Sequence, residues 1–100
     1  MTTISFKRSG GFVGKGMRFQ ISLDELPASH AQALTQLIEQ SQFFHLPENL
    51  IVKFNPDEYQ YTITVDTGWM SHTVRTNDTT MPASLRPLAD ALASFHSVAG

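Results

Sequence analysis

Four short stretches of the chain alternate apolar and polar residues. Alternation with a period of two is typical of strands that bury one face and leave the other in water. The four stretches are residues 4–8, 17–23, 59–65 and 70–76. Four glycines between residues 10 and 16 separate the first two stretches, and the turn-forming residues 66–68 separate the last two. We therefore expect two antiparallel hairpins.

Two other stretches carry apolar residues at helical spacing, which predicts amphipathic helices with one buried stripe each. The stripes are Ala31, Leu34, Leu37 and Ile38 in the first helix, and Leu85, Leu88, Leu92 and Phe95 in the second. The first helix can begin with a capping box at Ser29 or with Pro27 as its first residue. Residues 46–47 are expected to end it. Ser84 is the expected N-cap of the second helix, because Pro87 then lies in the first turn, where a missing N–H costs little.

The predicted order of elements is ββαββα. A four-stranded antiparallel sheet with both helices packed on one face buries the two helical stripes most simply, so the fold class is α+β. The other face of the sheet should be open to water and carries Thr62, Thr64, Thr73 and Arg75. The 100 residues, 41% apolar and 16% charged, are expected to form a single domain, 1–100, with its core at about residues 4–95. Residues 47–57 are expected to form a loop, with a short extended piece at residues 50–52.

The charge pattern excludes some classes of protein. A net charge of −2 argues against a general nucleic-acid binder, which would show a strong basic excess. Four of the seven basic residues precede Asp24, the first acid, and they are Lys7, Arg8, Lys15 and Arg18. This asymmetry is either chance in a short chain or a basic segment that faces an acidic partner. The sequence shows no stretch near the roughly 20 apolar residues of a membrane span, no hydrophobic leader and no cysteine, so we expect no membrane partner and a cytoplasmic location.

The sequence contains no evident set of catalytic or metal-ligating residues. The four histidines lack the spacing of a helical zinc site, and the phosphate-loop, dinucleotide and nucleophile-elbow motifs are missing. The adjacent carboxylates at 57 and 58 would point to opposite faces of a strand. We therefore predict no catalytic residue, no metal and no cofactor, and a protein that is not an enzyme.

The segment of residues 9–16, called the glycine loop below, holds the aromatic Phe12 between glycines. This side chain either folds back over the sheet or is exposed as an anchor for another protein. Trp69, in the turn of the second hairpin, presents the same choice. Tyr59 and Tyr61 fit the core side of their strand better than a nucleic-acid platform, which would also need a basic groove.

The segment of residues 4–14, ISFKRSGGFVG, resembles the opening of the emfourin family. These are small bacterial and archaeal protein inhibitors of thermolysin-like (M4) metalloproteases such as protealysin. Four further pieces resemble the family in the same order, and they are residues 43–47, 57–65, 72–75 and 85–88. The resemblance covers roughly residues 4–92. It departs from the family at residues 15–16 and 67–70, and selectivity would differ if those loops touch the protease.

The resemblance implies a non-enzymatic inhibitor that blocks the active-site cleft of a metalloprotease, with the zinc belonging to the enzyme. It does not say which residues make contact. Thermolysin-like enzymes favour a bulky apolar side chain just after the cleaved bond, and Phe12 is such a side chain. We therefore expect the main insertion element to consist of Arg8, Ser9, Gly10, Gly11 and Phe12, with Trp69 and Met70 as a second contact. We expect a monomer. The alternative is a protein-binding or adaptor module of the same fold with no protease target.

Overall fold

The computed structural model describes residues 2–11 and 16–99. Beyond Ser94 it describes the backbone only. Three predictions therefore lie outside the described residues. They concern Phe12 as an anchor, the charge of Lys15, and the side chain of Phe95 in the second helical stripe.

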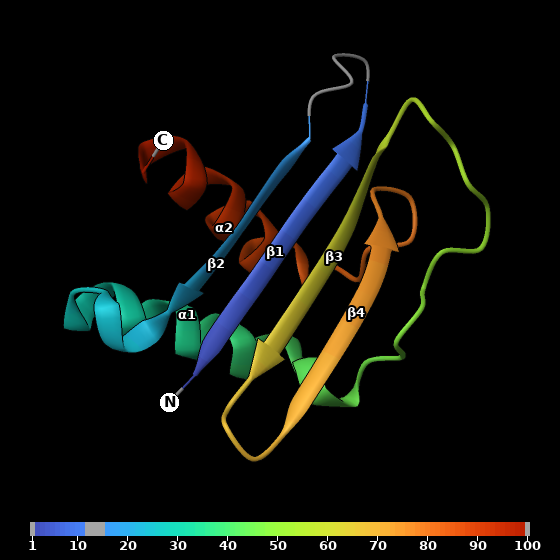
Figure 1. Ribbon diagram of the computed structural model, residues 1–100. Helices are drawn as coiled ribbons and strands as arrows, with labels where there is room; N and C mark the ends of the chain where they lie inside the picture. The colour runs from blue at the N-terminus through green and yellow to red at the C-terminus, as the bar shows by residue number, and fades with distance from the viewer. Residues whose placement is uncertain (1, 12–15, 100) are drawn as a thin grey trace.

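The described chain forms one four-stranded antiparallel sheet (Figure 1). The strands are β1 (Thr3–Gly10), β2 (Met17–Ser22), β3 (Tyr59–Asp66) and β4 (Ser71–Asn77), in the spatial order β2-β1-β3-β4. β1 and β2 pair as one hairpin and β3 and β4 as another, and β1 pairs with β3 in the middle of the sheet. Both predicted hairpins are confirmed.

Two helices, α1 (Ala28–Ser41) and α2 (Arg86–Ala99), lie on the same face of the sheet (Figure 1). Two short 3₁₀ turns, η1 (Leu23–Glu25) and η2 (Phe43–His45), flank α1. The α+β architecture and the order ββαββα agree with the prediction. No helix within the described part of the chain is long and apolar enough to cross a bilayer.

The hydrophobic core lies between the sheet and the helices, as the two periodicities predict. Its fully buried strand residues are Ile4, Phe6, Ile63, Val65 and Val74. The helices contribute the buried side chains Leu34, Ile38, Leu88, Ala89 and Leu92, and Leu85 joins them from the turn before α2. Tyr61 is also buried, and Tyr59 is half-buried on the same face, so the core-side interpretation of the tyrosines is confirmed.

The ends of α1 differ from the prediction. The helix begins at Ala28 after an extended Pro27, whose carbonyl accepts the N–H groups of His30 and Ala31. Ser29 therefore lies inside the first turn, and the capping box is wrong. At the other end Gln42 adopts a left-handed conformation with φ of 52°, and its N–H bonds back into the helix. The α-helix thus ends at Ser41, well before the predicted end at residues 46–47.

α2 begins at Arg86, one residue later than a Ser84 cap would place it. The N–H groups of Leu85 and Arg86 both donate to the carbonyl of Pro82, which forms a turn ahead of the helix. Leu85 is fully buried at the N-cap position, and Pro87 is the second helical residue. Burial of Leu85 in the core, rather than capping by Ser84, fixes this start.

The extended piece expected at residues 50–52 is replaced by a single bridge slightly earlier in the chain. Asn49 bridges Arg75 in parallel orientation. The N–H of Leu50 donates to the carbonyl of Arg75 over 2.8 Å, and the N–H of Arg75 donates to the carbonyl of Glu48 over 2.8 Å. The segment after α1 therefore runs along the outer edge of β4 (Figure 1).

Candidate functional site

The first candidate site is the end of the sheet where β1 enters the glycine loop and β3 begins. Ser9 is paired with Gln60, and Gly10 with Tyr59. Beyond the strand, the N–H of Gly11 donates to the carbonyl of Pro56 over 3.2 Å. The residues that lead into the loop are therefore held against the start of β3. Residues 8–11 are called the loop root below.

Gly10 and Gly11 are needed at this position because the backbone passes very close to its neighbours. Their φ angles are 86° and 79°, in the left-handed region that side chains disfavour. A Cβ on Gly10 would lie 2.7 Å from the carbonyl oxygen of Glu58, and a Cβ on Gly11 would lie 2.8 Å from Cε1 of Tyr59. These two glycines thus hold the loop root close to β3 and give it a defined course.

Arg8, the first residue of the loop root, stacks on the ring of Tyr59. The guanidinium carbon of Arg8 lies 4.1 Å from the centroid of the Tyr59 ring, which is within the range of a cation–π contact. Nε of Arg8 is buried and has no hydrogen-bond partner among the described residues. The structure therefore places Arg8 as a brace for Tyr59, and Tyr59 in turn lies against Gly11.

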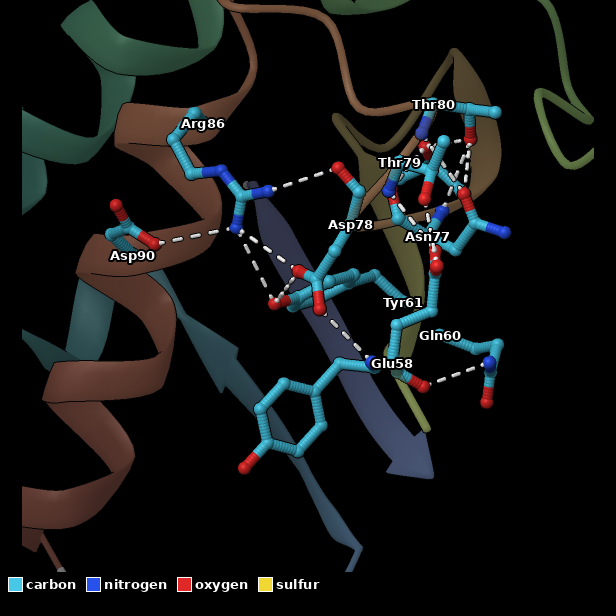
Figure 2. Close-up of polar contacts among 11 residues, drawn as sticks. Glu58, Gln60, Tyr61, Asn77, Asp78, Thr79, Thr80, Arg86 and Asp90 are labelled. Atoms are coloured by element: carbon cyan, nitrogen blue, oxygen red, sulfur yellow. Dashed lines mark hydrogen bonds and ion pairs between the residues drawn. The ribbon is translucent and has the colours of Figure 1, made fainter. Parts of the chain in front are cut away.

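The carboxylate of Asp78 also anchors Tyr59, and Figure 2 shows this carboxylate in contact with Tyr61 and Arg86. Asp78 accepts the N–H of Tyr59 over 3.0 Å and the hydroxyl of Tyr61 over 2.9 Å. Nη1 of Arg86, from the first residue of α2, lies 3.3 Å from the same carboxylate. Burial of the ring and the hydrogen bond to Asp78 raise the pKa of Tyr61 above its ordinary value, against the opposing effect of Arg86. The cluster ties the start of β3 to the start of α2.

A second set of hydrogen bonds fixes the segment of residues 52–58, called the 52–58 segment below. The carboxylate of Glu58 accepts the N–H of Thr79 over 3.0 Å and its hydroxyl over 2.7 Å (Figure 2). Nδ2 of Asn77 donates to the carbonyl of Lys53 over 3.1 Å. The segment that accepts the Gly11 N–H is therefore itself attached to the turn that follows β4.

Two large apolar side chains are exposed on the 52–58 segment. Val52 is 90% exposed and Phe54 is 66% exposed. A hollow of about 290 Å³ lies beside them, lined in part by Lys53, Glu58 and Thr79. The sequence alone does not single out this apolar pair, because the pattern predicts a loop over residues 47–57 with an extended piece at residues 50–52. A Val and a Phe within an otherwise polar loop were the available signal.

The predicted second contact, Trp69 and Met70, lies at the opposite end of the sheet. Trp69 is 85% exposed and Met70 is 39% exposed, in the turn that joins β3 to β4. β1 pairs through Thr3 with Asp66 at this end and through Gly10 with Tyr59 at the other. Seven strand steps of about 3.3 Å separate the two ends by roughly 23 Å. The structure therefore does not bring the two predicted contact elements together.

The described residues contain no group of three or more potential metal ligands. His72 illustrates how a histidine is used here. Its Nε2 lies 2.7 Å from the carbonyl oxygen of Leu46, and its ring packs edge-on against Phe43. This histidine therefore fastens the exit from α1 to β4.

The model of the emfourin family, described simply as emfourin, matches residues 6–93, from β1 into α2. The chain belongs to the emfourin family. The match includes the loop root, the 52–58 segment and both hairpins, and the family resemblance seen in the sequence is confirmed. No curated protein matches the chain.

The chain is also similar to a solved structure titled "Emfourin (M4in) from Serratia proteamaculans, M4 family peptidase inhibitor". The two share 20% sequence identity, and the alignment covers 90% of this chain and 87% of the other with a TM-score of 0.49.

Proposed function

We propose that the protein inhibits a thermolysin-like zinc metalloprotease of the M4 family by inserting its glycine loop into the active-site cleft. Membership of the emfourin family supports this proposal, because the members are inhibitors of such enzymes. In this mechanism the zinc and all catalytic groups belong to the protease. The protein acts by occupying the cleft and not by a reaction of its own.

The observation that carries the mechanism is the fixed loop root. Gly10 is paired with β3, the N–H of Gly11 donates to the carbonyl of Pro56, and the Tyr59 ring lies against Gly11. A loop whose entry is already fixed loses less conformational entropy when it binds. The glycine loop can therefore be presented to a narrow cleft at a small ordering cost.

The proposed role of Phe12 follows from the chemistry of its side chain, and the roles of the other predicted site residues follow from their positions. Phe12 supplies the bulky apolar side chain that thermolysin-like enzymes favour just after the cleaved bond. Ser9, Gly10 and Gly11 bring the backbone to the cleft, and Arg8 braces the loop root through Tyr59. We infer that Val52 and Phe54 contact the rim of the same cleft, because they lie on the segment that bonds to Gly11. Trp69 and Met70 would contact a separate part of the protease.

The test measures inhibition of a thermolysin-like enzyme hydrolysing a peptide substrate, with Phe12→Ala and its conservative control Phe12→Leu. Phe12→Ala should weaken inhibition by about 2 kcal/mol or more, or about 30-fold in the inhibition constant. Phe12→Leu keeps a bulky apolar side chain and should inhibit nearly as well as the original protein. Circular dichroism checks that both variants are folded.

Two results would contradict the proposal at different levels. Equal inhibition by Phe12→Ala and the original protein would remove Phe12 from the mechanism and leave inhibition standing. No inhibition of several thermolysin-like enzymes by the original protein, even in large molar excess, would favour the adaptor alternative.

A further inference from the structure

The open face of the sheet carries a row of basic side chains. Arg18 on β2 is paired with Lys7 on β1, Lys7 with Thr62 on β3, and Thr62 with Arg75 on β4. These four residues form one line across the whole sheet, and they alternate with the buried residues Phe6, Ile63 and Val74, so they lie on the face away from the core. With strands about 4.8 Å apart, the line is about 15 Å long. Lys7, Arg18 and Arg75 are called the cation row below.

The cation row is exposed and has no acidic partner within the described chain. All three of its side chains are exposed. The ion pairs found among the described residues join Arg86 to Asp78 and Asp90, on the other side of the sheet. Asp66 is the acidic residue on the open face of β3, and it lies four residues beyond Thr62. The positive charge of the row is therefore not neutralised by the fold.

The arrangement of Lys7 and Arg18 opposes folding. The two cations are directly opposite each other on neighbouring strands. Like charges in that position destabilise a sheet, whereas Thr has a high strand propensity and would suit either site. At this pair of positions the cations therefore add no stability that a neutral residue would not supply. An anion that binds from outside would offset the repulsion between them.

Hydroxyl and amide groups next to the cation row complete a surface suited to carboxylates. A hollow of about 340 Å³ lies over this part of the sheet, and its polar lining comprises Ser5, Lys7, Arg18, Gln20, Thr62 and Thr64. The hydroxyls of Thr64 and Thr73 are hydrogen-bonded to each other over 2.8 Å and extend the polar surface towards β4. Cations flanked by neutral donors can bind several carboxylates along one line.

We propose that the cation row is a docking surface for an acidic segment of a partner protein. The partner is acidic because charge complementarity favours it. The three unneutralised cations of the row would bind carboxylates spaced along the partner segment. The net charge of −2 makes a nucleic acid a poorer occupant, because its continuous negative charge would also meet the acidic remainder of the molecule. The surface lies on the flat of the sheet and not at the loop root, so the proposal does not depend on protease inhibition.

The test uses a synthetic glutamate-rich peptide and follows the backbone amide signals of the isotope-labelled protein by NMR. The shifts should concentrate on β1, β2 and β4 around the cation row and should weaken as salt is raised. A triple variant, Lys7→Thr with Arg18→Thr and Arg75→Thr, should lose at least about tenfold in affinity. The matched control is Lys53→Thr, which removes an exposed cation outside the row and should bind the peptide as before.

A stability measurement provides a second, independent readout. Lys7→Thr should raise the thermal midpoint by about 1 to 5 °C, because it removes the like-charge pair. A lower midpoint would mean that the cation serves the fold and would overturn the proposal. Equal peptide affinity in the triple variant, or tighter binding of a single-stranded oligonucleotide than of the peptide at the same salt, would also overturn it.

Discussion

Tyr59 connects the loop root to the rest of the molecule. Its ring lies against Gly11 and beside the guanidinium of Arg8. Its N–H donates to the carboxylate of Asp78, and its carbonyl accepts the N–H of Asp78 over 3.2 Å. A change at Asp78 is therefore expected to reach the loop root through one tyrosine, without contact between Asp78 and the loop.

Asp78→Ala should destabilise the protein by about 1 to 3 kcal/mol. It leaves the hydroxyl of Tyr61 and the N–H of Tyr59 without their acceptor. The matched control is Asp90→Ala, because Asp90 is exposed and lies 3.9 Å from the same Arg86. An exposed ion pair of this kind contributes little, so the control should stay within about 0.5 kcal/mol. Urea unfolding measures both, and equal losses would contradict the assigned role of Asp78.

The sequence predicts some of these residues and not others. Alternation along residues 59–65 places Tyr59 and Tyr61 on the core side of the strand. It cannot reveal Asp78 as their partner, because that contact depends on the register of β3 with β4 and on the turn after β4. The contact of Arg8 cannot be predicted from the sequence for the same reason. Its charge is visible in the sequence, but its stacking on Tyr59 requires the pairing of β1 with β3.

At the scale of elements, periodicity predicts the strands and helices well and their ends poorly. The apolar stripes of four strands and two helices are local features of the sequence, and all of them face the core as far as the structure describes them. The left-handed Gln42 ends α1, although a non-glycine residue at such a position gives no sequence signal. Burial of Leu85 decides the start of α2, and burial is a property of the tertiary structure.

The glycine loop offers a test of the fixed loop root. Gly11→Ala should cost about 1 to 2 kcal/mol for a left-handed non-glycine residue, and its new Cβ must displace the Tyr59 ring. Gly16→Ala is the matched control, since Gly16 lies outside the left-handed region and its Cβ would lie 3.2 Å from the nearest atom, the carbonyl oxygen of Arg8. Thermal unfolding and protease inhibition should both be impaired by the first change and nearly preserved by the second.

A reversal of this order, with Gly16→Ala the more damaging variant, would show that the loop depends on its exit into β2. Equal inhibition by both variants would show that the course of the loop root is irrelevant to binding.

At the scale of the whole molecule, the two exposed aromatic sites are at opposite ends of the sheet. Phe54 lies at the same end of the sheet as the loop root. Trp69 lies at the end of the sheet where β1 starts. The sequence located the glycine loop and the Trp69 turn separately. It could not show that they are far apart, or that the 52–58 segment lies beside the loop root. Both facts follow from the central pairing of β1 with β3.

The separation predicts how aromatic truncations combine. Phe54→Ala should weaken protease inhibition at least about fivefold, because Phe54 lies two residues before Pro56, whose carbonyl accepts the N–H of Gly11. Lys53→Ala, at the neighbouring residue, serves as a control with little effect. Trp69→Ala should cause a smaller loss. The free-energy losses of the double variant Phe54→Ala with Trp69→Ala should add within about 0.5 kcal/mol, because distant sites are independent. A large loss from Trp69→Ala with none from Phe54→Ala would move the interface to the other end.

The bridge between Asn49 and Arg75 also affects how the protein behaves at high concentration. Unpaired strand edges are templates for aggregation. On β4 the backbone groups of Arg75 are already occupied by Glu48 and Leu50, which leaves less of that border for an incoming chain. The opposite border belongs to β2, which has six residues and an exposed arginine. Both borders thus carry features that discourage the growth of intermolecular sheets, and we expect the protein to remain dispersed when it accumulates.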